Sequence, residues 1–209
     1  IGFELFRQYV RALEESGCRY FLYENNNSIS DEIKEEISKA LGVQPITIDS
    51  ALVSAQNRKR CYWTNIPGVK QPKDRMIEIQ DILESGIAYQ KKAYCLTTSY
   101  GGAVLWNSLE RSQRTMVAEL DEGGEEVKGR KIRLTHKNRE KEEITKEYKI
   151  NLADGYYSFR KMTPVEIERL QTLPDNFTEG IDTQARYKAV GNGWTVDIIA
   201  HILNYLKSA

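Results

Sequence analysis

Helical and strand-like patterns alternate over the first 65 residues, and this alternation constrains the fold more than any other feature. Apolar side chains recur at helical spacing from Phe3 to Leu13, which predicts an amphipathic helix over residues 2–15. The order helix, strand, helix, strand, strand is typical of α/β folds, and a strand–helix–strand unit predicts parallel pairing. The later elements are expected at residues 19–24 (strand), 31–41 (helix), 45–49 (strand) and 61–65 (strand).

The middle of the chain has a weaker pattern and a blocky charge distribution. An acidic stretch over 110–127 is followed by a basic stretch over 128–149. Short polar–apolar alternations and the Asp154-Gly155 turn signal predict β-strands in this part. We therefore expect an α/β domain from residues 1–68 and 158–209, and a small β-rich domain from residues 69–157.

The C-terminal part of the sequence is helical again. Thr163, Pro164 and Glu166 have the spacing of a capping box with proline at the first helical position. Two more helices are expected, one ending at Gly191 and one over residues 195–207.

Composition limits the classes of protein that fit. The 30 Lys and Arg residues balance the 30 Asp and Glu residues, which excludes a globally cationic nucleic-acid coat but not a local basic face. No apolar run approaches the roughly 18 residues of a membrane span, and no signal-peptide pattern opens the chain. Three cysteines and two histidines lie far apart, so we expect no metal site and a reducing compartment. Because Ile1 stands where a natural chain has Met, we expect a fragment.

Glu24 is the first candidate for chemistry. It stands where the hydrophobic strand 19–24 ends, and open parallel sheets bind ligands outside the carboxyl ends of their strands. A carboxylate at this place can hold a ring nitrogen and an exocyclic amine together. The alternative is a glutamate that caps the next loop, and position alone favours this alternative.

Gln56, Arg58 and Arg60 form the second candidate group. Alternate residues of an extended segment share a face, so these side chains should point together. Two guanidinium groups on one face suit a phosphate or a base carbonyl oxygen. A solvated basic turn explains the same residues equally well, and the pattern leaves both readings open.

Asn192, Gly193 and Trp194 form the third candidate group, at the junction of two helices. Glycine allows close backbone approach, asparagine can bond an amine or a carboxylate, and tryptophan can stack on a ring. The alternative is a helix C-cap followed by a core tryptophan, which is favoured for an isolated Gly-Asn-Gly-Trp.

The order of four segments is more specific than any one of them. The sequence resembles the carboxyl-terminal blocks of DNA (cytosine-5) methyltransferases in the segments FLYENN, SALVSAQNRKRCYWTNIPG, RKMTPVEIERLQTLPDNFTEGI and RYKAVGNGWTV. It is similar to the de novo branch of the animal enzymes and to its phage or prophage relatives. The resemblance implies the C-terminal half of a class I, Rossmann-like S-adenosylmethionine-dependent methyltransferase fold. Residues 69–157 then occupy the place of the target recognition domain.

The resemblance also implies roles for the candidate residues. In the family, a target cytosine is flipped out of double-stranded DNA into a pocket. Glu24 would hold ring N3 and the exocyclic amine, and Arg60 would contact O2. Arg58 would contact a phosphate or the catalytic loop. The remaining assignments are Gln56 as support in the DNA-binding segment, and Asn192, Gly193 and Trp194 at a partial S-adenosylmethionine site.

The basic stretch supplies the candidate DNA contacts of the recognition domain. A solvated charged hairpin is the commoner outcome for such a stretch, so both readings stay open. The candidates are Lys128, Arg130, Lys131, Arg133, Lys137 and Arg139.

Two features of the family are absent from these 209 residues. No Pro-Cys pair, which carries the family's nucleophile, and no glycine-rich cofactor loop occur in the sequence. We therefore expect a methyltransferase fragment or subunit that is inactive alone and needs an N-terminal half or a partner subunit. The unpaired edge of strand 19–24 invites such a partner or a homodimer. The alternative is a non-catalytic DNA-binding or regulatory remnant. The resemblance further implies a cytoplasmic protein of a bacterium or phage, in a restriction–modification context.

Overall fold

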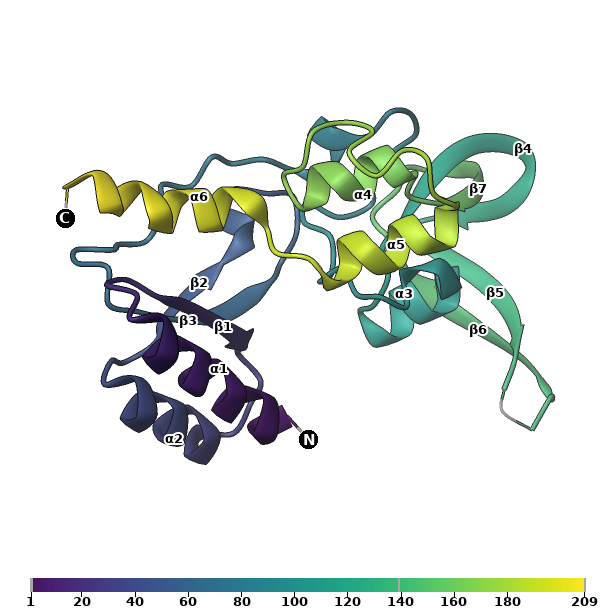
Figure 1. The fold of residues 1–209 in the computed structure, drawn as a ribbon. Helices are drawn as coiled ribbons and strands as arrows, with labels where there is room; N and C mark the ends of the chain where they lie inside the picture. The colour runs from purple at the N-terminus through teal and green to yellow at the C-terminus, as the bar shows by residue number, and fades with distance from the viewer. Residues whose placement is uncertain (1, 139, 209) are drawn as a thin grey trace. The chain divides into compact units, whose positions relative to one another are not determined.

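The computed structural model describes residues 2–138 and 140–208, and the chain divides into two compact units (Figure 1). The expectation for Ile1 and the candidate contact Arg139 therefore lie outside the described residues. The first unit comprises Ile1–Asp49, Lys59–Lys73 and Ile198–Ala209; the second comprises Ser50–Arg58 and Asp74–Asp197. The predicted domain border at 69–157 stays a prediction.

A three-stranded antiparallel sheet forms the centre of the first unit. Its strand order is β1-β3-β2, and β3 is antiparallel to both neighbours. The predicted parallel pairing is therefore wrong: β1 and β2 run in the same direction, but β3 inserts between them. The elements are α1 (Gly2–Ser16), β1 (Leu22–Asn26), α2 (Asp31–Leu41), β2 (Ile46–Asp49) and β3 (Lys59–Thr64).

An aromatic core packs α1 and α2 against this sheet (Figure 1). Phe6, Ile37 and Trp63 are buried together, and the Trp63 indole donates to Ser38 Oγ at 2.9 Å. The Tyr23 ring lies 5.2 Å from Phe6 and 5.8 Å from Trp63 between ring centroids. Amphipathic periodicity in the sequence therefore identified α1 correctly, and its apolar face covers the sheet.

The second unit contains a four-stranded antiparallel sheet of strand order β6-β5-β4-β7. The strands expected in the middle of the chain are thus present, and β4 carries an irregularity between Leu120 and Glu125. The strands are β4 (Met116–Lys128), β5 (Lys131–Lys137), β6 (Glu143–Lys149) and β7 (Gly155–Lys161).

Short helices complete the two units. None of the helices in the described part of the chain is long and apolar enough to cross a membrane. The α-helices are α3 (Leu105–Arg111), α4 (Pro164–Leu170), α5 (Thr183–Asn192) and α6 (Val196–Asn204). The 3₁₀ helices are η1 (Ser50–Leu52), η2 (Ile79–Ile82), η3 (Tyr100–Gly102) and η4 (Tyr205–Ser208).

The start of α4 is the capping box that the sequence predicts. Glu166 N donates to Thr163 Oγ1 at 3.1 Å, and Thr163 N donates to a Glu166 carboxylate oxygen at 2.8 Å. The Glu166 carboxylate is fully buried and accepts from two nitrogens of Arg160 at 2.8 Å each. The hydrogen bonds to Glu166 raise the pKa of Arg160. This paired charge ties the helix start to β7.

Glu168 is a second fully buried carboxylate on α4. It accepts from Arg186 Nη2 at 2.8 Å and from Thr178 N at 2.9 Å. Burial raises the pKa of Glu168, but the hydrogen bonds from Thr178 and Arg186 more than offset this and hold the pKa below its usual range. A carboxyl whose folded-state pKa is depressed stabilises the fold above its unfolded pKa, and this contribution is lost as pH falls through the folded value.

Replacing Arg186 tests this ion pair. Arg186→Gln leaves a buried carboxylate without its cation, and we expect a loss of about 3 kcal/mol in the free energy of unfolding at pH 7. The difference from the wild type should shrink as the pH falls, because protonation removes the uncompensated charge. Urea unfolding at pH 7 and pH 4 measures this difference, with the exposed Arg7→Gln as control. A difference that stays constant with pH would contradict the assigned pairing.

Candidate functional site

Glu24 and Arg60 form an ion pair across two adjacent strands of the first unit. Arg60 Nε lies 2.9 Å from Glu24 Oε1, and their side chains are only 14% and 16% exposed. Glu24 lies opposite Tyr62 and Arg60 opposite Asn26, so the pair is a diagonal contact on one face of the sheet. The sequence predicted that Glu24 lies at the end of its strand. Strand β1 instead continues to Asn26, so Glu24 lies in the middle of the strand.

This pair places a carboxylate and a guanidinium side by side in a mostly buried setting. A carboxylate accepts two N–H groups, and a guanidinium donates to a carbonyl oxygen. Glu24 and Arg60 together therefore suit a planar heterocycle that presents N–H donors beside a carbonyl oxygen. The alternative of a loop-capping glutamate is not what the structure shows, because Glu24 is inside a paired strand.

Gln56 and Arg58 are buried in the second unit, so the reading of a solvated basic turn is wrong for these two residues. Gln56 Oε1 accepts from Leu96 N at 3.1 Å, and the Gln56 side chain is fully buried. Arg58 is 6% exposed and donates to Leu96 O at 2.8 Å and to Gly193 O at 2.9 Å. These contacts favour positioning roles for both side chains over direct contact with DNA.

The Asn192–Trp194 turn closes α5. Gly193 is the C-cap residue, and its N–H donates to Val190 O. Trp194 is 49% exposed, so the alternative of a core tryptophan is wrong. An exposed indole beside the exposed Asn192 offers a stacking face and amide hydrogen bonds, which suit an adenine ring.

Gly191 is required by a close backbone approach. A Cβ atom there would lie 2.5 Å from the Thr97 carbonyl, whereas a Cβ at Gly193 would have its nearest neighbour at 3.4 Å. Gly191 is therefore needed because a side chain would not fit against Thr97, whereas Gly193 caps α5 at a place where a side chain would fit.

Replacing each glycine with alanine tests whether only Gly191 is required for close packing. Gly191→Ala should lower the free energy of unfolding by about 2 kcal/mol, because the overlap forces α5 away from Thr97. Gly193→Ala should change it by less than about 0.5 kcal/mol. Thermal unfolding of both variants measures the difference, and equal loss of stability would contradict the close contact.

The basic candidates lie on the β-hairpin formed by β4 and β5 in the second unit. Gly129 and Arg130 have φ of 57° and 58°, the conformation of a type I′ turn. Along β5 the exposed residues alternate with buried ones, and the opposing strand β6 carries Glu143 and Glu147. Lys131 pairs with Glu147 at 2.8 Å. The exposed candidates are Lys128, Arg130, Lys131, Arg133 and Lys137.

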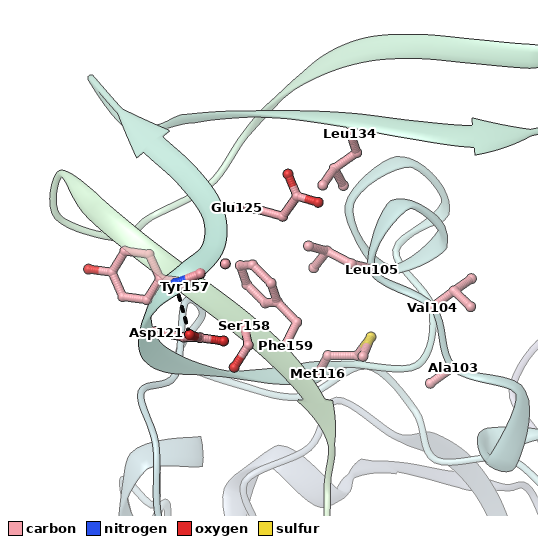
Figure 2. Close-up of a pocket in the computed structure, with 12 residues that line it drawn as sticks. Ala103, Val104, Leu105, Met116, Asp121, Glu125, Leu134, Tyr157, Ser158 and Phe159 are labelled. Carbon is pink, nitrogen blue, oxygen red and sulfur yellow. Dashed lines mark hydrogen bonds between the residues drawn. The ribbon is translucent and has the colours of Figure 1, made fainter.

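A pocket of about 560 Å³ lies elsewhere in the second unit, between the bend of β4, β7 and the start of α3 (Figure 2). Phe159 and Met116 form apolar walls, and Asp121 and Glu125 add negative charge. None of the candidate catalytic, cofactor-binding or DNA-binding residues named above lines it. Gly124 marks the bend, because a Cβ there would lie 2.3 Å from Tyr157 O. The two carboxylates disfavour a phosphate at this pocket.

The three cysteines form no disulfide bond in the structure. Cys18 is exposed, Cys61 is buried and Cys95 is half-buried, and all three are free thiols. Within residues 2–138 and 140–208, no three His, Cys, Asp or Glu side chains gather closely enough to hold a metal ion.

The fold is mixed α/β, with helices packed against antiparallel sheets, and the family follows from comparison. The family model described as C-5 cytosine-specific DNA methylase matches residues 2–208. The chain therefore belongs to the C-5 cytosine-specific DNA methylase family.

Individual relatives agree with this family. The chain is 44% identical over 54 residues to the type II methyltransferase M.Sau3AI of Staphylococcus aureus, covering 26% of this chain and 13% of that protein. It is 26% identical to the DNA (cytosine-5)-methyltransferase DRM2 of Oryza sativa subsp. japonica, covering 99% of this chain and 35% of that protein. The chain thus spans about a third or less of these relatives.

A solved structure shows the same fold. The structure of the S. pombe Dnmt2 methyltransferase superposes with a TM-score of 0.55 at 14% sequence identity. The superposition covers 97% of this chain and 72% of that chain. The expected methyltransferase fold is therefore confirmed.

Proposed function

We propose that this chain supplies the base-holding and target-recognising part of a DNA cytosine-5 methyltransferase. The Glu24–Arg60 pair carries this proposal, because it offers the acceptor and donor groups that match the edge of cytosine. The chain works with a complementing segment that carries the Pro-Cys loop and the glycine-rich loop, since the 209 residues contain neither. Alone, the chain transfers no methyl group to DNA.

Glu24 stabilises the form of the base that reacts. When a thiolate of the complementing segment adds to carbon 6, the proton on N3 offsets the charge that enters the ring. The Glu24 carboxylate accepts hydrogen bonds from protonated N3 and from the exocyclic amine, and Arg60 donates to O2. Because the two side chains are mostly buried and already paired, they need little reorganisation when the base enters.

The Asn192–Trp194 turn is the part of the S-adenosylmethionine site that this chain provides. The exposed Trp194 indole and the Asn192 amide suit the adenine ring and its amine. When bound, S-adenosylmethionine supplies the methyl group that passes to carbon 5. The residues of this turn would hold the adenosine, while the Glu24–Arg60 pair and the complementing segment act on the base.

The edge of β1 is the place where a complementing segment fits. In its sheet β1 has β3 as its neighbour on one side, and it lies at the edge on the other. An open strand edge offers backbone donors and acceptors to another strand. A second copy of this chain competes for the same edge.

Origin in a bacterium or phage and a restriction–modification role belong to the same proposal, supported by the likeness to a type II methyltransferase.

Glu24→Gln tests the role of the carboxylate. Mixed with the complementing segment, duplex DNA and labelled S-adenosylmethionine, the variant should transfer methyl groups at least about 100-fold more slowly, because an amide stabilises protonated N3 poorly. Duplex binding should be nearly unchanged. The exposed Glu35→Gln on α2 is the matched control.

Equal rates for Glu24→Gln and the wild type would exclude the assigned role. Duplex binding without transfer in any pairing of the parts would instead support the non-catalytic DNA-binding remnant.

Neutralising the exposed face of β5 tests the recognition surface. We change Lys131, Arg133 and Lys137 together to Gln. The negative slope of log affinity against log salt should become shallower by about 2 to 3, as expected for two to three lost phosphate contacts. Duplex binding at several salt concentrations measures the slope, and Arg7 and Arg11 changed to Gln on α1 are the control. An unchanged slope would identify this face as a solvated charged hairpin.

A further inference from the structure

Gln171 is a fully buried amide with all its hydrogen-bonding capacity engaged in the second unit. Its Oε1 accepts from Gln56 Nε2 and from Thr195 Oγ1, each at 2.9 Å. Its Nε2 donates to Val190 O and to Gly193 O, each at 3.0 Å. Two acceptor sites and two donor hydrogens are therefore used at once.

These four bonds join three segments that are far apart in the sequence. Gln171 caps α4, Gln56 belongs to the segment that leads into β3, and Gly193 belongs to the turn after α5. Arg58 donates to the same Gly193 carbonyl at 2.9 Å, so two side chains from different segments hold one backbone oxygen. The backbone adds a further link, because Val196 N donates to Gln171 O at 3.0 Å.

We propose that Gln171 is a positioning residue for the Asn192–Trp194 turn. By fixing the carbonyl of Gly193, the Gln171 amide sets the path of the backbone into Trp194 and so the direction of the exposed indole. The consequence for the cofactor rests on the proposed function, in which this turn borders S-adenosylmethionine.

Glutamine is the residue type that these contacts require. Glutamate has the same shape but no N–H, so it would face the Val190 and Gly193 carbonyls with an acceptor. Methionine has a similar length, but it would leave the Gly193 carbonyl with one donor in place of two and would leave buried polar groups without partners. A side chain that only fills space would not need four matched partners.

The base-holding pair does not depend on this amide. Glu24 and Arg60 are fixed by the β1–β3 ladder of the first unit, in which Gln171 has no part. A loss of Gln171 should therefore affect the two halves of the reaction unequally. The KM for S-adenosylmethionine should rise about tenfold, which corresponds to about 1.4 kcal/mol, while kcat should fall less than about threefold.

The experiment compares Gln171→Met and Gln171→Glu with Gln184→Met, a matched change at an exposed glutamine of α5. The first readout needs no ligand: hydrogen exchange of the backbone amides from residue 191 to 196 in this chain. The second is the KM and kcat for S-adenosylmethionine with the complementing segment. Gln171→Asn keeps the amide and shortens its reach, so it serves if neither of these two variants folds.

Faster exchange confined to residues 191–196, with a raised cofactor KM, supports the proposal. Faster exchange spread evenly over the chain overturns it, because Gln171 would then be only a stabilising core residue. Faster local exchange with an unchanged KM would show that Gln171 positions the turn, but it would overturn the claim that the cofactor binds there. Loss of transfer in the wild type, with the local exchange effect intact, counts against the proposed function alone.

Discussion

The insertion of β3 between β1 and β2 is the constraint on which the candidate site depends. The antiparallel register sets Arg60 opposite Asn26 and therefore diagonal to Glu24, which brings the two charges to 2.9 Å on one face. A slip of one residue would turn Arg60 to the opposite face of the sheet. The aromatic core under this sheet, with Trp63 fully buried, fixes the register. The Glu24–Arg60 ion pair is thus a consequence of packing on the other face of the sheet.

The second unit is organised by buried polar side chains. Glu166, Glu168 and Gln171 all come from α4 or its cap, and all three are fully buried. Each forms hydrogen bonds with specific side chains or carbonyls of other segments, which ties α4 to the segments around it. Together with the buried Ile167 and Leu170, these contacts fix α4 against β7 and α5.

Sequence periodicity was sufficient for much of the local structure, whereas the candidate residues came from their positions and from the family resemblance. The helix over residues 2–15, the capping box at Thr163 and strand β5 follow from local patterns, whereas the long strand β4 lies in a stretch marked only by its acidic charge. The antiparallel insertion of β3 does not, because it depends on contacts between residues about 40 positions apart. The burial of Gln56 and Arg58 was equally hidden, since polar residues in an extended segment read as solvated unless their distant partners are known. The pocket at the bend of β4 was not predicted, because it depends on the irregularity in β4 and on side chains from distant segments.

The most direct test of the account is covalent trapping on a duplex that contains 5-fluorocytosine. Fluorine at carbon 5 blocks the final elimination, so a base activated at N3 and attacked at carbon 6 stays attached to the protein. With the complementing segment and S-adenosylmethionine present, the account predicts a trapped complex by mass spectrometry that forms with this chain and not without it. Folded, DNA-binding parts that yield no trapped complex in any pairing would contradict the claim that this chain holds the reacting cytosine.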